Sequence, residues 1–542
     1  MRLVETDVLV IGAGPVGLSL AGDLGWRGID CLLVEQTDGA ILQPKMDGVG
    51  VRTMEFCRRW GIVEWVEAAP YNRYYPQDNA YLTSLNGYEL EREPMAAMAM
   101  DGPPPESPQK RERCPQNMFD PVLRRFAAAQ APTTLLYEHR LESFEELDGH
   151  VEAVIRNMRS DAIFRVRCRF LVGCDGGRSL VRQGLGIPMN GTVLTYTTNI
   201  VFRCPEFNRL HDKKPAYRYM FVDESGVWAT IVAINGNDEW RMSIVGDTQR
   251  REYSDDELRG LARRALGRDL DLEILSRLQW TRVEAVADAY GSGNVFVAGD
   301  ACHLTSPTGG LGMNTGIGDA VDLSWKLAAV LEGWGGAQLL ASYGIERRPV
   351  AQRITRFSTG NLEAMKGAPS SAEIEAATPE GARVRGAVGE FLKAHLRREW
   401  FSKNMHLGNR YLDSPVIAYT EPEDADANRM EYEEPVRYRP STRPGVRAPH
   451  VWLAPDESIL DHYGRGFVMV STGENPLGAE SLEREARSAG IPFRILRSDD
   501  PEVARVYELA WVLVRPDGHV AWRGRTLDVD ARTLWRKVTG HQ

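Results

Sequence analysis

The spacing of apolar positions divides the 542-residue chain into regions with different predicted structure. Near the N-terminus, the apolar runs 8–11 and 31–34 flank a helical period, which is typical of a βαβ unit. Residues 187–283 instead carry consecutive strand-like runs of Val, Ile, Thr and Trp, which predict a separate sheet. Helical spacing returns over 318–405. Because the chain is too long for one hydrophobic core, the pattern predicts an α/β protein of several domains.

The C-terminal region, residues 446–542, has a pattern of its own. An apolar run at 466–470, a helical period over 477–489 and a second apolar run at 492–496 predict two parallel strands around a helix. A hairpin around 516–518 follows, and a short helix ends the region. This order resembles a thioredoxin-like fold, but the region has no cysteine and so cannot perform thiol exchange. We expect it to have a structural or dimer-stabilising role.

The first apolar strand runs directly into Gly12-Ala-Gly14-Pro15-Val-Gly17. This spacing gives a tight turn at the first glycine, close approach of backbone to a pyrophosphate at the second, and close helix packing at the third. The helix N-terminus that follows favours negative charge. Glu35 ends the second strand 18 residues after Gly17, near the spacing expected for a carboxylate that binds a ribose hydroxyl. The sequence predicts an adenine dinucleotide site, and a plain glycine-rich turn is the less favoured alternative.

Two further strand ends carry an acidic residue beside glycine, at Asp175-Gly176 and at Gly299-Asp300. Ligands of doubly wound sheets bind beyond the carboxyl ends of the strands, where Asp300 would accept a hydrogen bond from a polyol such as the ribityl chain of FAD. The loop that begins at Pro307 has consecutive glycines before a helix, so its N–H groups and the helix dipole favour a ligand edge with negative charge. The candidates in this loop are Gly310, Leu311, Gly312, Met313 and Asn314.

Composition narrows the classes of partner. The net charge of −10 disfavours nucleic acid and anionic lipid, and no apolar run reaches the length that spans a membrane. The seven cysteines are scattered and none has the C-x-x-C spacing, which favours a reducing, cytoplasmic location and predicts no metal site.

In these motifs and their order, the chain resembles the single-component FAD-dependent aromatic hydroxylases. The resemblance is greater to their longer branch, which includes phenol hydroxylase and the polyketide hydroxylases and ends in a thioredoxin-like domain without redox cysteines. It implies FAD as the cofactor and NADPH or NADH as the co-substrate. The fold expected is α/β: a Rossmann-like FAD-binding domain over 1–82, 106–186 and 284–360, an inserted β-sheet substrate domain over 83–105 and 187–283, a helical segment and linker over 361–445, and a thioredoxin-like domain over 446–542.

The resemblance also assigns roles to single residues. Lys45 stands where the family usually has the Arg of Pro-Arg-Ala, so the charge is kept and the planar fork is lost. Gln116 and Arg124 lie in a family stretch in which Asp120 replaces the usual Glu. The implied cofactor-binding residues are Gly12, Gly14, Pro15, Gly17, Glu35, Gln36, Lys45, Arg52, Gln116, Asp175, Gly299, Asp300 and the loop residues 310–314.

Two residues are catalytic candidates, Asp47 and Pro307. Asp47 resembles the aspartate beside the substrate hydroxyl in phenol hydroxylase. In an apolar cavity its pKa would rise and it would accept a phenolic proton, and a plain Asp-Gly turn is an equal alternative. Aromatic side chains on the strands of 199–245 would wall the substrate cavity or form plain core; they are Phe202, Tyr217, Tyr219, Phe221, Trp228 and Trp240.

The resemblance implies that NAD(P)H reduces FAD, that O2 then forms a flavin C4a-hydroperoxide, and that its distal oxygen passes to a phenolic or activated aromatic ring in a site that excludes water. The same chemistry on a ketone would be a Baeyer–Villiger or polyketide-tailoring reaction. An FAD-dependent oxidase or dehydrogenase and a flavin-bound scaffold are further alternatives. The expected partners are an aromatic small molecule, O2 and NAD(P)H, and a homodimer is left open.

Overall fold

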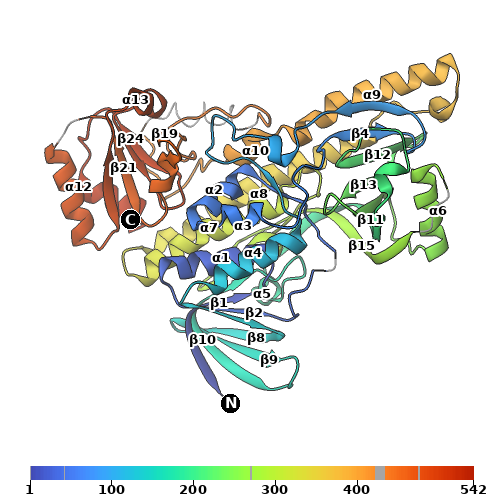
Figure 1. Cartoon of the computed structure of the whole chain (residues 1–542). Coiled ribbons are helices and arrows are strands. Elements are labelled where there is room, and N and C mark those ends of the chain that lie inside the picture. The colour runs from blue at the N-terminus through green and yellow to red at the C-terminus, as the bar shows by residue number, and fades with distance from the viewer. Residues whose placement is uncertain are drawn as a thin grey trace.

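Strands far apart in the sequence form the sheet that carries the glycine-rich turn (Figure 1). The computed structural model describes residues 2–41, 43–268, 272–420, 432, 434–473 and 476–541. The strands of this first sheet are β1 (Leu3–Ile11), β2 (Cys31–Glu35), β7 (Thr133–Tyr137), β8 (His139–Leu147), β9 (His150–Asn157), β10 (Ile163–Gly173), β16 (Gly291–Ser292) and β17 (Val295–Val297). Their path is β16-β17-β10-β1-β2-β7, and the β8–β9 hairpin extends from β10. β1 pairs in parallel with β2 and β10, and β10 with β17, so the carboxyl ends of four strands meet at one edge.

Helices cover this sheet because its central strands are apolar on both faces. Consecutive residues 8–10 of β1 are fully buried, as are residues 31–34 of β2. The helices of this domain are α1 (Pro15–Arg27), α2 (Val51–Trp60), α3 (Val63–Glu67), α4 (Gln116–Ala128), α5 (Leu180–Gly184), α7 (Gly312–Leu331) and α8 (Ala337–Lys366). α2 and α3 are separate helices because Gly61, with φ +71°, ends the first of them.

A second sheet lies beside the first domain, at the right of Figure 1. Its strands are β4 (Asn79–Leu82), β5 (Glu89–Glu93), β11 (Met189–Arg203), β12 (Arg218–Asp223), β13 (Gly226–Ala233), β14 (Glu239–Asp247), β15 (Glu273–Ala287) and β18 (His303–Leu304). The path is β18-β15-β11-β14-β13-β12-β4-β5. β3 (Gly48–Val49) and β6 (Glu112–Arg113) form a separate small pair.

Short 3-10 helices occur in several parts of the chain. They are η1 (Met98–Met100), η2 (Phe207–Arg209), η3 (Gly299–Ala301), η4 (Ala372–Glu375) and η5 (Ile459–His462).

The two faces of the second sheet differ because side chains alternate along a strand. On β14, Trp240 and Met242 belong to a buried apolar cluster with Leu258 and Ala262 of α6 (Asp255–Leu266). Arg241, between them, binds the loop before β3 instead. The face opposite α6 is therefore directed to the first domain.

The topology differs from the sequence prediction at three domain boundaries. Residues 79–82 form β4, which pairs in parallel with β12, so the predicted limit of the FAD-binding domain at 82 is wrong. β15 continues to Ala287, past the predicted limit at 283, because its residues up to 287 pair with β11. α8 likewise continues to Lys366, beyond 360. α9 (Pro379–Trp400) and α10 (Lys403–Leu407) follow, and residues 421–431 and 433 of the predicted linker lie outside the described residues.

The C-terminal domain, at the left of Figure 1, has a four-stranded sheet in the order β22-β21-β23-β24. Its elements are β19 (Trp452–Ala454), β20 (Glu457–Ser458), β21 (Phe467–Ser471), α12 (Pro476–Ser488), β22 (Phe493–Arg497), α13 (Pro501–Tyr507), β23 (Trp511–Val514), β24 (Val520–Gly524) and α14 (Ala531–Val538). β21 and β22 are parallel and β23 and β24 antiparallel, which confirms the βαβ–ββα order. The predicted fold class is thereby confirmed.

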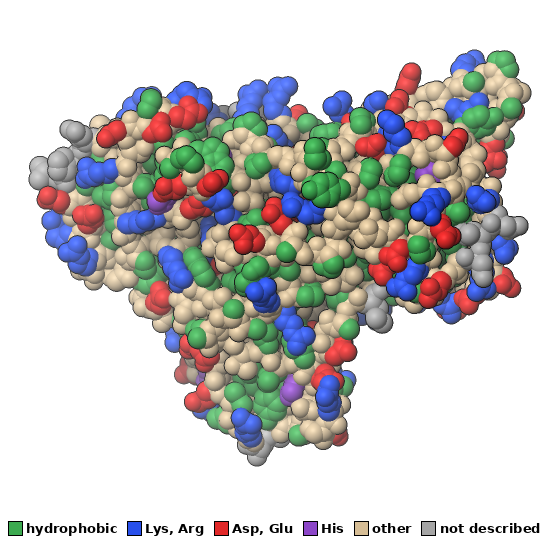
Figure 2. Space-filling view, in the orientation of Figure 1, with side chains coloured by type: hydrophobic (Ala, Val, Ile, Leu, Met, Phe, Trp, Pro, Cys, Tyr) green, Lys and Arg blue, Asp and Glu red, His purple; other side chains and the backbone are tan. Residues whose placement is uncertain are grey.

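Aromatic packing joins this domain to the first. Trp325 of α7 is fully buried against Phe467 of β21, with ring centroids 6.1 Å apart in an edge-on arrangement. Positive and negative side chains are interspersed over the face of the molecule seen in Figure 2. Among the described residues, no helix is both long and apolar enough to cross a membrane.

Candidate active site

The glycine-rich turn between β1 and α1 is shaped by close backbone contacts. Gly12 has φ +104°, and a Cβ atom there would lie 2.4 Å from the carbonyl oxygen of Cys174. At Gly17, a Cβ atom would lie 1.9 Å from the Gly12 oxygen. At Gly14, nothing lies within 4 Å of the Cβ position, and no side chain caps the N-terminus of α1. The turn therefore has the open approach that a pyrophosphate requires.

Glu35 lies at the mouth of this turn, at the end of β2. One carboxylate oxygen accepts a hydrogen bond from the Ala13 N–H at 2.9 Å. The other accepts from the N–H and hydroxyl of Thr37, both at 2.8 Å. Glu35 thus holds the turn itself, and a contact to a ribose hydroxyl stays a prediction. Gln36, beside it, is exposed.

The other two acidic strand ends have different surroundings. The Asp175 carboxylate accepts hydrogen bonds from the N–H groups of Leu180 and Val181, at 2.7 and 3.2 Å, so it caps α5. Gly299 has φ +63°. The Asp300 carboxylate next to it is exposed and makes no hydrogen bond or ion pair within the part of the chain that the structure describes. Asp300 is therefore the free carboxylate at this sheet edge.

The loop from Pro307 to Asn314 is a second backbone surface at this edge. Gly309 and Gly310 have φ of +98° and +63°, and nothing lies within 4 Å of the Cβ position of Gly310. Leu311 is 1% exposed and packs in an apolar cluster with Val350 and Ile354, so only its backbone is available to a ligand. Pro307 is half-buried and its carbonyl accepts from the Gly310 N–H at 3.0 Å.

Asn314 connects this loop to α2. Its Oδ1 accepts hydrogen bonds from the Gly50 N–H and the Thr53 hydroxyl, both at 2.7 Å. Its Nδ2 donates to the Gly310 oxygen at 2.8 Å. The side chain predicted to bind cofactor therefore joins two protein segments. Met313 packs partly buried against the core of the first domain, and Gly312 begins α7.

The loop before β3 carries Lys45, which is exposed. Gln116 holds this loop through the backbone: its Oε1 accepts from the Lys45 N–H and its N–H donates to the Met46 oxygen, both at 3.1 Å. Burial raises the pKa of Asp120, which accepts from Gln116, to about 7. The guanidinium of Arg52 is directed elsewhere, to Glu55 at 2.6 Å and to the Asp517 oxygen of the C-terminal domain at 2.8 Å. The structure thus assigns Arg52 to the domain interface.

Asp47 lies in a charged and hydrogen-bonded setting. Its carboxylate accepts two hydrogen bonds from Arg241, at 3.1 and 2.6 Å, and one from the Tyr217 hydroxyl at 3.0 Å. Burial raises the pKa of Asp47, but the charge and hydrogen bonds of Arg241, the charge of Arg113 and the hydrogen bond from Tyr217 together outweigh burial and hold the pKa below its ordinary value. The predicted rise in the pKa of Asp47 is therefore wrong, because the expectation of an apolar cavity left out Arg241.

The aromatic residues expected to wall a cavity lie mostly on the other face of the second sheet. Trp240 stacks on Phe207 at 3.8 Å, and Tyr219 also contacts Phe207. Phe202, Tyr219, Phe221 and Trp240 are buried in the cluster under α6, as plain core. Tyr217 alone of the set makes a polar contact toward the first domain, through Asp47.

The face of the second sheet toward the first domain carries polar side chains instead of these aromatic ones. Glu399 of α9 is buried, and one of its carboxylate oxygens accepts from the Gly309 N–H at 3.0 Å and from Arg218 at 3.2 Å. Arg282 donates to the Thr197 hydroxyl at 3.0 Å, and burial lowers the pKa of its guanidinium to about 10. The sequence analysis missed Arg241 and Glu399. Arg241 had a signal in the sequence, because it stands between two apolar residues of a predicted strand. Glu399 had no such signal.

Comparison with known proteins agrees with this geometry. Residues 5–358 match a family model described as an FAD binding domain, and residues 441–540 match one described as the C-terminal part of aromatic-ring hydroxylases. The chain belongs to the FAD-dependent aromatic-ring hydroxylases. It is 32% identical to a putative polyketide hydroxylase of Streptomyces halstedii, over 96% of this chain and 94% of that one. It is 28% identical to a phenol 2-monooxygenase of a Pseudomonas species, over 98% and 92%. The structure of the rebeccamycin biosynthetic enzyme RebC with reduced flavin matches at a TM-score of 0.92, with 38% identity and full coverage of both chains.

The residues present in this hydroxylase fit FAD. Gly14 and Gly310 leave open space where a side chain would stand. The Asp300 carboxylate is exposed and has no partner among the described residues. A Cβ atom at Gly299 would lie 2.8 Å from Val16 of α1, so the sheet edge with Asp300 lies against the dinucleotide turn. The hydroxylase is thus an FAD-dependent monooxygenase by family, and the open glycines and the Asp300 carboxylate are compatible with bound FAD.

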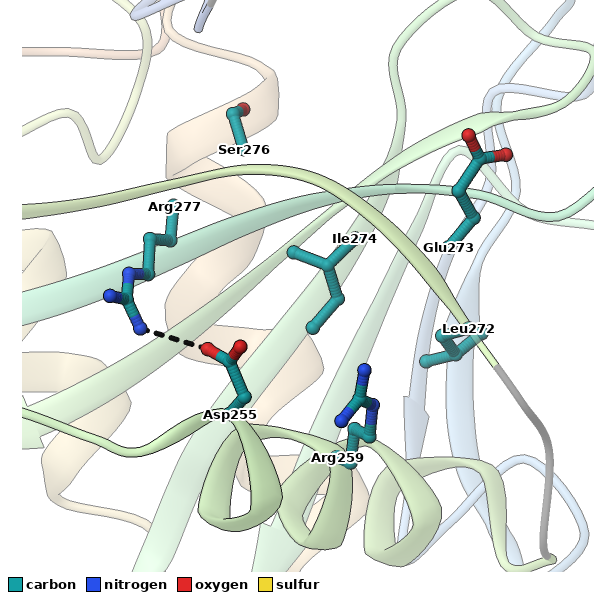
Figure 3. A pocket seen from close by; sticks show the side chains of 7 residues that line it. All are labelled: Asp255, Arg259, Leu272, Glu273, Ile274, Ser276 and Arg277. Atoms are coloured by element: carbon teal, nitrogen blue, oxygen red, sulfur yellow. Dashed lines mark hydrogen bonds and ion pairs between the residues drawn. The ribbon is translucent and has the colours of Figure 1, made fainter.

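A surface pocket of about 680 Å³ lies apart from this site, between α6 and β15 of the hydroxylase (Figure 3). Charged side chains dominate its lining, and Arg277 donates to Asp255 at 2.9 Å across it. None of the predicted cofactor residues lines it. The pocket is therefore separate from the residues that the sequence predicted to bind the cofactor.

Proposed function

We propose that this hydroxylase uses NADH or NADPH and O2 to hydroxylate a phenolic or otherwise electron-rich aromatic compound. One oxygen atom of O2 replaces a ring hydrogen as hydroxyl, the other leaves as water, and NAD(P)H supplies the two electrons. The observation that carries the proposal is that the free Asp300 carboxylate and the open glycines 14 and 310 share one sheet edge that faces the polar face of the second sheet.

Bound FAD would supply the activation of O2. The chain's own residues have three tasks. The turn at 12–17 and Asp300 would bind the cofactor, and the N–H groups of 310–314 would lie along its ring. The contacts of Glu399 to Gly309 and Arg218 hold the second sheet against this loop, and this closure would exclude water from the region between them.

Asp47 would act as a fixed anion. Since its pKa lies below the ordinary value, it is charged at neutral pH and a proton taken from a phenol would not stay on it. We infer that it orients the Tyr217 hydroxyl and accepts a hydrogen bond from substrate, while Arg241 fixes its direction. Its role as a phenol base, suggested by the resemblance, is therefore not part of the proposal.

The relatives define which substrates to test. Their printed names include polyketide hydroxylases and a phenol monooxygenase, and RebC has been described with bound 7-carboxy-K252c. The holoenzyme is incubated with simple phenols, polycyclic polyketide phenols and 7-carboxy-K252c, and NADH and NADPH oxidation is followed. Stimulated oxidation with a product heavier by one oxygen atom supports the proposal. Substrate oxidation without NAD(P)H would instead identify an oxidase, and oxygen insertion beside a ketone would identify a Baeyer–Villiger enzyme.

A further inference from the structure

Arg515 of the C-terminal domain is inserted into the first domain. It follows β23, and its side chain is fully buried. Its terminal nitrogens donate to the two carboxylate oxygens of Glu346 at 2.6 and 2.9 Å, and one of them also donates to Asp322 at 3.2 Å. Glu346 lies on α8 and Asp322 on α7. One guanidinium from the C-terminal domain thus joins two helices of the FAD-binding domain.

This guanidinium is needed for local charge balance. Lys326 donates to Asp322 at 2.8 Å and to Glu346 at 2.6 Å, and Asp517 binds Arg515 at 2.7 Å. Three buried carboxylates therefore share two buried cations in direct ion pairs. His519 also contacts Asp517, at 3.1 Å, but burial lowers the pKa of its imidazole, so it adds no positive charge at neutral pH. Without Arg515, one lysine would remain for three carboxylates, and unpaired charge in a protein interior is costly. Burial and the charge of Glu346 raise the pKa of Asp322 to about 7 against the opposing charges of Lys326 and Arg515, so Asp322 depends on both cations for its negative charge.

α7 and α8 also contact the predicted FAD site, through Asp319, which lies one turn before Asp322 on α7. Arg347 of α8 donates to Asp319 of α7 at 2.8 Å and to the Thr315 oxygen in the first turn of α7 at 3.0 Å. The other oxygen of Asp319 accepts from the Gly299 N–H at 3.2 Å and contacts His303 at 2.8 Å. Gly299 directly precedes Asp300. The spacing of α7 and α8 therefore sets the position of both the Asp300 segment and the start of α7.

The residues around Asp319 could instead be interpreted as a cation site. Cys302, His303 and Asp319 offer ligand atoms within 4.8 Å of one another. Asp319 is already paired with Arg347, whose positive charge opposes a metal ion at the same carboxylate. A Cβ atom at Gly318 would lie 2.8 Å from Arg347, so the helix surface is shaped to hold this arginine. The cluster is a positioning network.

We propose that Arg515 is a positioning residue for FAD: by neutralising Asp322 and Glu346 it sets the spacing of α7 and α8, through which Asp319 and Arg347 hold Gly299, Asp300 and the first turn of α7 in the conformation that binds the cofactor. The C-terminal domain thereby contributes to cofactor affinity without contacting the cofactor. The proposal rests on FAD binding at the sheet edge and not on the identity of the aromatic substrate.

The test is FAD titration of full-length apo-protein, followed by flavin fluorescence, together with the melting temperature of the apo-protein. Arg515→Met is expected to raise the FAD Kd by about tenfold, which corresponds to about 1.4 kcal/mol. Val512→Ala is the matched control, because Val512 is buried in a cluster formed only by residues of the C-terminal domain. It is expected to lower the melting temperature with little change in Kd.

A double variant tests whether charge is the cause. Arg515→Met combined with Glu346→Gln removes one cation and one carboxylate, and part of the lost FAD affinity is expected to return. Should Arg515→Met fail to fold, Arg515→Lys keeps the charge but cannot reach Glu346 and Asp322 with a planar fork, and weaker FAD binding is again expected. The proposal is overturned if the Arg515 variant binds FAD as tightly as wild type or the Val512→Ala control, or if the double variant recovers nothing. Loss of hydroxylation alone would bear on the proposed function instead.

Discussion

Arg241 binds Asp47 through both of its terminal nitrogens, with Nη1–Oδ1 at 3.1 Å and Nη2–Oδ2 at 2.6 Å. Nη1 also donates to the Pro44 carbonyl oxygen at 2.8 Å. Since Arg241 is on β14 and the other two residues lie in the loop before β3, one guanidinium joins the second sheet to the segment that carries Lys45. A forked, charge-assisted pair of this kind fixes direction as well as distance, so the loop depends on Arg241 for its geometry.

The ionisation of Asp47 is expected to be absent from the pH profile of the enzyme between about pH 5 and 9, because a lowered pKa keeps the carboxylate charged over that range. Asp47→Asn is expected to lower kcat/KM by about tenfold at every pH, as the loss of a charged hydrogen-bond acceptor. The measurement is substrate-stimulated NAD(P)H oxidation across pH. An acidic limb in the wild-type profile that Asp47→Asn removes would restore the role of phenol base.

Two glycines of the first turn are expected to respond differently to alanine. Gly17→Ala places a Cβ atom 1.9 Å from the Gly12 oxygen, so the apo-protein is expected to unfold at a clearly lower temperature. Gly14 has φ −73° and open space around it, so Gly14→Ala is expected to leave the apo-protein as stable as wild type and to weaken FAD binding. Thermal unfolding and FAD titration of both variants check this. Equal FAD affinity of Gly14→Ala and wild type would place the pyrophosphate elsewhere.

Asp300→Ala is expected to weaken FAD binding by about tenfold or more, the effect of losing a hydrogen bond to a charged acceptor. The melting temperature of its apo-protein is expected to stay unchanged, because Asp300 is exposed and unpaired among the described residues. The matched control is Asp319→Asn, which removes charge from a buried carboxylate that binds Arg347 and is expected to destabilise the apo-protein as well. If Asp300→Ala lowers apo-protein stability and leaves FAD affinity intact, the carboxylate has a structural role.

The parts of the site that the sequence predicted are those fixed by local backbone geometry. Gly12 has a φ of +104°, and a Cβ atom at Gly17 would meet the Gly12 oxygen. Both constraints arise within a single strand–turn–helix unit, so the spacing of the glycines after an apolar strand identified the turn. Gly299 and Gly310 have positive φ, which few other residues adopt, so glycine there was also a strong signal. The fold class was predicted from the alternation of strand-like and helix-like spacing of apolar residues along the chain.

The parts that it did not predict depend on contacts between distant segments. Arg241 and Asp47 are 194 positions apart, and the direction of the pKa shift of Asp47 depends on that contact together with those of Arg113 and Tyr217, which are also distant in the sequence. β4 was placed in the wrong domain, because only pairing with β12 shows which sheet it joins. The hydrogen bond from Arg52 to the Asp517 oxygen forms only once the C-terminal domain has docked, so nothing in the sequence indicated it, and the expected contact of Arg52 with the cofactor stays a prediction.

Glu55 is expected to make the stability of the enzyme sensitive to acid. Burial raises its pKa, but Arg447 and Arg52 outweigh burial and lower the pKa to about 2. A lowered pKa stabilises the fold above the unfolded-state value of 4.5, and this stabilisation of about 3 kcal/mol is lost as the pH falls from there towards 2. Denaturant unfolding of wild type, Glu55→Gln and Glu483→Gln, a control at an exposed position of α12, is measured from neutral to acidic pH. Glu55→Gln is expected to be less stable at neutral pH and to change less with acid, because Arg447 then lacks its charged partner throughout. Parallel pH dependences for wild type and Glu55→Gln would show that the stabilisation comes from other carboxylates.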